Sequence, residues 1–158
     1  MNRIKFLLVF VLAAFMGCQT EDVFDEQEQL AIDKQLIEDY LQENNLSAQE
    51  IDETGIYYLI TQPGTGDNAK VAESVFAHYK GYLLDSTEFD TSAGKGPFDF
   101  VIGAGTVVRG WELGFQELNK GASATLFIPS KYGYGTRRQG SIPASSVLLF
   151  DVTVVDIR

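Results

Sequence analysis

The stretch ASATLFI at residues 122–128 gives the clearest indication of the architecture. Small or apolar residues at every second position, from Ala122 to Ile128, alternate with Ser123, Thr125 and Phe127. Successive side chains of a strand point to opposite faces, so this period of two is typical of a strand with one buried face. The stretch therefore predicts a strand that lies against a core.

Further strands are predicted on both sides of this one. Ranges rich in β-branched and aromatic residues, most of them alternating in the same way, are 56–61, 75–84, 98–102 and 148–154. A turn cluster follows the first of them at residues 63–66, and one short helical stretch covers about residues 110–119. Strands at hairpin-like spacing with one short helix predict an antiparallel sheet that covers the helix, an α+β fold.

The first 17 residues have the pattern of an export signal. Arg3 and Lys5 precede an apolar run from Phe6 to Met16, which is shorter than the roughly 20 apolar residues that span a bilayer. The small residue Gly17 and then Cys18, the only cysteine, follow this run, and the placement of Cys18 resembles the lipobox of bacterial lipoproteins. We expect a lipoprotein signal peptide at 1–17 and lipidation of Cys18. Ordinary signal cleavage and an unmodified cysteine are the alternatives.

Acidic residues are concentrated after this signal. Residues 19–53 hold 12 Asp and Glu side chains against the single Lys34, whereas the formal net charge of the whole chain is −10. We interpret 18–54 as an acidic tether and an amphipathic helix of about four turns that ends near residues 44–45. The expected apolar stripe of that helix consists of Leu30, Ile32, Leu36, Ile37, Tyr40 and Leu41. Packing on its own domain is the favoured interpretation, and a dimer through the same stripe stays open.

Several kinds of chemistry are poorly supported. His78 is the only histidine and Cys18 lies at the signal, so neither a Ser-His-Asp site, a Cys-His site nor a zinc site can be assembled. The glycines of 103–105 and 94–96 lack the remaining residues of a dinucleotide fingerprint or a P-loop. Clustered Lys and Arg are absent, which argues against nucleic acid as a partner. We expect no metal and no cofactor.

A series of motifs in residues 55–158 resembles the FKBP-type peptidyl-prolyl isomerases. They occur in the order and near the spacing of that family, and together they are specific where each alone would be weak. The matching segments are AHYKG (77–81), EFDTS (88–92), GPFDF (96–100), VVRGWE (107–112), IPS (128–130), YGYG (132–135), IP (142–143) and LFDV (149–152).

The resemblance implies a half-barrel of five or six antiparallel strands around the short helix, with a shallow apolar pocket between them. Trp111 would form the floor of this pocket, and Phe89, Asp90 and Tyr134 would face the twisting amide. The residues to which the resemblance gives catalytic roles are Tyr79, Phe89, Asp90, Trp111, Tyr134 and Phe150, and those to which it gives substrate binding are Phe98, Val107, Val108 and Ile142. A basic partner often accompanies the aspartate in the family, and Lys95 is the candidate here.

Together these features predict an isomerase of X-Pro bonds that acts on exported, proline-containing polypeptides as a folding factor. Rotation about an amide breaks conjugation without forming a covalent bond, so the lack of histidine bases does not count against it. Lipidation would anchor the protein to a membrane of the bacterial cell envelope, on the extracytoplasmic side and preferably at the outer membrane. The alternative is a non-catalytic module that holds proline-containing segments in an envelope or motility complex.

Overall fold

The computed structural model describes residues 25–158. The predicted signal at 1–17, the lipidation residue Cys18 and the first part of the acidic tether lie outside the described residues. The elements in chain order are α1 (Glu26–Glu43), β1 (Gln49–Glu50), β2 (Tyr57–Gln62), β3 (Thr65–Asn68), β4 (Ser74–Tyr82), β5 (Glu88–Thr91), β6 (Phe98–Val101), α2 (Arg109–Gly114), the 3₁₀ turn η1 (Phe115–Glu117), β7 (Asn119–Lys120), β8 (Ser123–Ile128), the 3₁₀ turn η2 (Ser130–Tyr132) and β9 (Leu148–Ile157).

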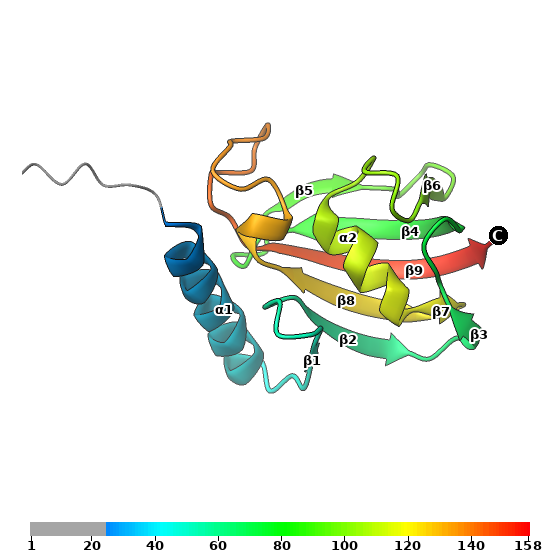
Figure 1. Cartoon of the computed structure of the whole chain (residues 1–158), viewed down its shortest axis with the longest axis horizontal. Coiled ribbons are helices and arrows are strands. Elements are labelled where there is room, and N and C mark those ends of the chain that lie inside the picture. The colour runs from blue at the N-terminus through cyan, green and yellow to red at the C-terminus, as the bar shows by residue number, and fades with distance from the viewer. Residues whose placement is uncertain (1–24) are drawn as a thin grey trace, which may run out of the picture.

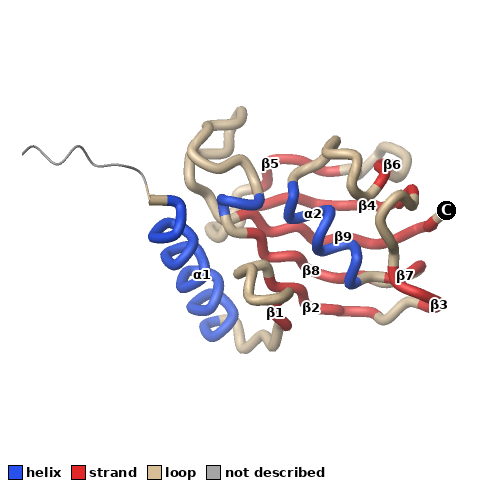
Figure 2. The backbone as a smooth tube through the Cα atoms, viewed as in Figure 1, coloured by secondary structure: helices blue, strands red, loops and turns tan. Residues whose placement is uncertain are grey.

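A single curved sheet, antiparallel throughout, forms the body of the protein, and α2 lies across one of its faces (Figure 1). Its order is β1-β2-β8-β9-β4-β5, and β6 also pairs with β4, which makes seven strands. The predicted α+β architecture is confirmed. β1, β5 and the separate pair β3-β7 were not among the predicted ranges, because these strands of two to four residues contain no fully buried side chain. The tube view in Figure 2 separates the strands from the long loops at either end.

The main core lies between the sheet and α2. Leu126 and Ile128 of β8 and Val154 of β9 are almost fully buried there, together with Phe115 after α2. Two helix glycines allow the close approach of α2 to β8. A Cβ at Gly114 would lie 2.8 Å from the Leu126 side chain, and one at Gly110 would collide with Ile128.

Helix α1 packs against the opposite face of the sheet, at one end (Figure 1). Asp25 caps it by accepting a hydrogen bond from the Gln27 N–H at 2.8 Å, so it begins four residues before the predicted apolar stripe. Ile37 and Leu41 are buried in a second cluster that includes Phe127 and other alternate residues of the sheet. The helix therefore shares a core with the domain that follows it, as expected.

The buried stripe of α1 differs from the predicted one. Ile32 and Leu36 are 48% and 43% exposed, whereas Asp33 is fully buried. Residues 33, 37 and 41 follow one another at a spacing of four and so share one side of the helix. Asp33 can be buried on that side because its carboxyl group accepts hydrogen bonds from Ser130. No helix within residues 25–158 combines the length and the apolar character needed to cross a membrane.

Candidate active site

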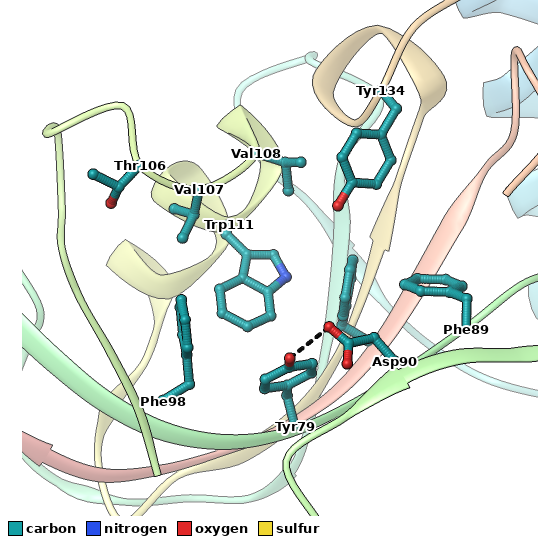
Figure 3. A pocket seen from close by; sticks show the side chains of 10 residues that line it. Tyr79, Phe89, Asp90, Phe98, Thr106, Val107, Val108, Trp111 and Tyr134 are labelled. Atoms are coloured by element: carbon teal, nitrogen blue, oxygen red, sulfur yellow. Dashed lines mark hydrogen bonds between the residues drawn. The ribbon is translucent and has the colours of Figure 1, made fainter. Parts of the chain in front are cut away.

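A cavity of about 390 Å³ opens between α2 and the sheet (Figure 3). It brings together nine of the ten pocket residues that the sequence predicted, from positions 79 to 150, and adds Thr106. The lining residues are Tyr79, Phe89, Asp90, Phe98, Thr106, Val107, Val108, Trp111, Tyr134 and Phe150.

Each wall of the cavity comes from a different element. Strands β4, β5, β6 and β9 supply Tyr79, the pair Phe89 and Asp90, Phe98 and Phe150, respectively. α2 supplies Trp111, and the loop before it supplies residues 106–108. Tyr134 comes from the loop that follows η2. The site thus depends on strand pairings and on two loops.

Trp111 is the centre of an aromatic cluster and is only 3% exposed. Its ring lies 5.1 Å from those of Tyr79 and Phe150 and 5.9 Å from that of Phe98, all in edge-to-face arrangements. Such contacts stabilise aromatic pairs beyond the area that they bury. They hold the indole as a rigid apolar base for the cavity.

Two tyrosine hydroxyls and one carboxylate provide polarity at the opening. The Tyr79 hydroxyl donates to Asp90 Oδ2 at 2.6 Å (Figure 3). Burial, and then this hydrogen bond, raise the pKa of Tyr79 to about 12. Burial also raises the pKa of Tyr134, with a smaller contribution from the Asp90 charge. Both phenols therefore keep their protons at neutral pH and can donate hydrogen bonds.

Further hydrogen-bond donors at the cavity lack partners. Trp111 Nε1 is buried and bonds to none of the residues 25–158. Figure 3 shows this nitrogen on the side of the indole nearer Tyr134 and Asp90. The backbone N–H of Val108, just before α2, likewise has no partner in the described part of the chain. An apolar cavity with a few unpaired donors suits a peptide segment, whose carbonyl groups accept hydrogen bonds.

Ile142 is the predicted site residue that does not line the cavity. It is only 4% exposed and belongs to the main core cluster. Backbone hydrogen bonds of 3.0 and 2.9 Å pair it with Gln139 across a tight turn, which holds its side chain within the core. Thr106 was missed, although it directly precedes the predicted Val107 and Val108.

The expected basic partner of the aspartate is also absent from the described residues. Lys95 Nζ donates to the backbone carbonyl of Thr91 at 3.3 Å, and the partner of Asp90 is Tyr79. His78 lies outside the cavity, where its Nδ1 is 3.3 Å from Ser92 Oγ. Arg109 Nη1 lies 3.0 Å from Glu112 Oε2 across the first turn of α2, so its charge is paired with this helix.

Comparison with known proteins agrees with this geometry. The model of the FKBP-type peptidyl-prolyl cis-trans isomerase family matches residues 66–155. FkpA of Aeromonas hydrophila is 40% identical over 107 residues, which are 67% of this chain and 39% of that protein. Fkbp12 of Drosophila melanogaster is also 40% identical over 107 residues, which are 66% of this chain and 99% of that one.

Solved structures point the same way. The crystal structure of FkpA from Escherichia coli aligns with a TM-score of 0.68 at 29% identity, covering 84% of this chain and 64% of that one. The chain matches about two-fifths of the length of its first curated relatives, with 42% and 39% coverage. Motif order, sheet topology and family match together lead to one conclusion: the chain belongs to the FKBP-type peptidyl-prolyl cis-trans isomerase family.

Proposed function

We propose that this protein accelerates cis/trans isomerisation of X-Pro bonds in polypeptides. The observation that carries the proposal is the aromatic cavity over Trp111, with Asp90, Tyr134 and the Val108 N–H at its margin. Uncatalysed X-Pro exchange takes tens to hundreds of seconds, slow enough to limit folding. A protein that shortens this step serves as a folding factor.

The cavity suits this reaction because no bond has to be made or broken. The barrier of about 18–20 kcal/mol reflects lost conjugation in the twisted amide. The planar amide is the more dipolar form and loses more solvation on entering an apolar cavity than the twisted form does. Each 1.36 kcal/mol of preference for the twisted form is worth about tenfold in rate. Donors such as the Tyr134 hydroxyl can then hold the neighbouring carbonyl groups of the peptide.

A relaxation assay tests the proposal directly. The purified protein is added to a peptide enriched in the cis X-Pro isomer, and the return to equilibrium is followed. We expect clear acceleration that falls at least tenfold in Tyr134→Phe and Trp111→Leu. Tyr132→Phe is the matched control, because Tyr132 is also half-buried on the same loop but does not line the cavity. Binding of the peptide without acceleration would instead favour the non-catalytic module.

We propose further that the protein works at the bacterial cell envelope, anchored through lipid on Cys18. The apolar run at 6–16, followed by Gly17 and then by the only cysteine, supports this proposal. Several acyl chains on one residue give stable anchoring, because each buried methylene adds about 0.8 kcal/mol. The acidic residues that follow would keep the domain at a distance from the membrane, so that it meets exported polypeptides on the extracytoplasmic side, preferably at the outer membrane.

Cell fractionation tests the anchor. The wild-type protein is expected in the membrane fraction and Cys18→Ser in the soluble fraction, with equal isomerase activity in both. Gln19→Ser changes the neighbouring residue and should leave the protein with the membrane. Retention of Cys18→Ser in the membrane fraction would contradict the lipid anchor.

A further inference from the structure

The carboxyl group of Asp33 is buried between α1 and the turn η2. Its residue is fully inaccessible, and its partner Ser130 is 2% exposed. The two residues are 97 positions apart, and Asp33 lies outside the segment that matches the family model, residues 66–155. One side of this contact, Asp33, therefore lies outside the segment matched by the family model, and the other side, Ser130, lies within it.

Three hydrogen bonds satisfy this carboxyl group. Oδ2 accepts the backbone N–H of Ser130 at 2.7 Å and the Ser130 hydroxyl at 2.5 Å. Oδ1 accepts from Gln29 Nε2 at 2.8 Å. A buried polar group without such partners would be strongly destabilising, so the position of Ser130 and the burial of Asp33 depend on each other.

Ser130 in turn holds the backbone on both sides of Tyr134. Its carbonyl oxygen accepts the N–H of Gly133 at 2.9 Å and the N–H of Gly135 at 2.8 Å. The Gly135 carbonyl then accepts the Ser145 N–H at 2.8 Å. A continuous set of hydrogen bonds therefore runs from Asp33 through Ser130 to Gly133 and Gly135, the residues on either side of Tyr134.

Close packing against α1 does not hold this part of the loop. A second cavity, of about 590 Å³, opens between the first turns of α1 and the loop, with Glu26 and Gln29 on one side and residues 133–137 on the other. Hydrogen bonds through Ser130 are thus the connection that restrains Tyr134 from the α1 side.

The helix has other attachments that do not need Asp33. Ile37 and Leu41 are buried against the sheet. Lys34 pairs with Glu50 at 2.8 Å, and the Tyr57 hydroxyl donates to Glu38 at 2.6 Å. Loss of the Asp33 carboxyl group should therefore free the loop while α1 remains in place.

We propose that Asp33 is a positioning residue for Tyr134, so that α1 contributes to the active site through Ser130. The inference rests on the proposed isomerase function for its kinetic consequence. Asp33→Ala should then misplace the Tyr134 hydroxyl, whereas Asp33→Asn keeps a carbonyl oxygen that can accept from Ser130.

The test compares full-length variants in the peptide relaxation assay. We expect kcat/KM to fall about tenfold in Asp33→Ala and to stay within about threefold of wild type in Asp33→Asn. The matched control is Asp39→Ala, because Asp39 accepts from Gln35 with the same spacing of four residues at 2.9 Å but is exposed. It should behave as wild type.

The Tyr134→Phe background separates positioning from general destabilisation. If Asp33 acts through the Tyr134 hydroxyl, Asp33→Ala should cause less than a twofold further loss once that hydroxyl is gone. An equal tenfold loss in both backgrounds would overturn the inference. If Asp33→Ala does not fold, Ser130→Ala replaces it in the same cycle, since it removes the hydroxyl and keeps the backbone N–H.

Nuclear magnetic resonance provides a readout that does not require activity. In protein labelled with ¹³C on the tyrosine rings, Asp33→Ala should shift or broaden the Tyr134 ring signals, and Asp39→Ala should not. Unchanged Tyr134 signals in Asp33→Ala would overturn the inference even if the wild type proved inactive. If the wild type were inactive but Asp33→Ala still perturbed the Tyr134 signals, the proposed function would be wrong and the positioning contact would remain supported.

Discussion

The Tyr79 hydroxyl and the Asp90 carboxylate form a hydrogen bond of 2.6 Å at the opening of the cavity. Tyr79 comes from β4 and Asp90 from the adjacent β5, where the register pairs Asp90 with Gly81. The other carboxylate oxygen, Oδ1, accepts the Thr91 N–H at 2.8 Å. Asp90 is thus held at both oxygens, although its side chain is exposed, and it faces the cavity in a fixed direction.

Tyr79→Phe should lower kcat/KM about five- to tenfold, because one oxygen of Asp90 loses its partner and a net hydrogen bond is worth about 1 kcal/mol. The melting temperature should hardly change, since the ring still packs on Trp111. Tyr82→Phe is the matched control. Tyr82 also lies on β4 and donates to an aspartate, Asp151, at 3.0 Å, but away from the cavity. Equal losses in both variants would argue against a role for the Tyr79 hydroxyl.

Gly81→Ala should distort the part of the cavity wall that Phe89 and Phe150 form. A Cβ there would lie 2.5 Å from the Phe89 ring and 2.8 Å from the Phe150 ring, too close for either to stay in place. We expect unfolding in urea to show a loss of about 1–3 kcal/mol, and the peptide assay a loss of activity of about tenfold or more. Gly96→Ala serves as control, because nothing lies within 4 Å of the added Cβ. Wild-type kinetics for Gly81→Ala would mean that the Phe89 and Phe150 rings can move without any loss of activity.

The reaction should be insensitive to pH between about 6 and 9, because Tyr79 and Tyr134 have pKa values raised above the ordinary value of about 10. Stability should behave differently at alkaline pH. The native state holds the Tyr79 proton more tightly than the unfolded chain does. The contribution of protonated Tyr79 to the free energy of unfolding is therefore complete below about pH 10 and is lost as the pH rises through about 12. Urea unfolding from pH 8 upward checks the fall, which Tyr79→Phe should reduce. A bell-shaped rate profile centred near neutrality would instead indicate a titrating base.

Alternation along the sequence predicted the long strands because each lays one face on a core. It could not predict β1 or the pair β3-β7, which are held by their neighbours rather than by a buried face of their own. The buried side of α1 was misassigned for a related reason. Hydropathy favoured Ile32 and Leu36 over Asp33, and only the fold brings Ser130 to the carboxyl group.

Most of the site could be predicted because its residues occur in recognisable motifs. The bond between Tyr79 and Asp90 could not, since it depends on the register of β4 against β5. The burial of Ile142 away from the cavity could not be predicted either, because it depends on a turn with Gln139. Contacts across the sheet, more than residue types, were the missing information.

Whether α1 is part of the folded domain or only a spacer can be decided with two isoleucines of the same helix. Ile37 is fully buried against the sheet, whereas Ile32 is 48% exposed. Ile37→Ala should lower the free energy of unfolding by about 2–5 kcal/mol, as expected for a truncated core side chain. Ile32→Ala should change it by less than about 0.5 kcal/mol. Urea unfolding followed by Trp111 fluorescence measures both, because the indole reports on the domain and not on the helix itself.

A single transition that shifts only in Ile37→Ala would mean that the helix unfolds together with the domain. If Ile37→Ala left the Trp111 transition unchanged, α1 would be a separate unit, and its hydrogen bond to Ser130 could not restrain the loop of Tyr134.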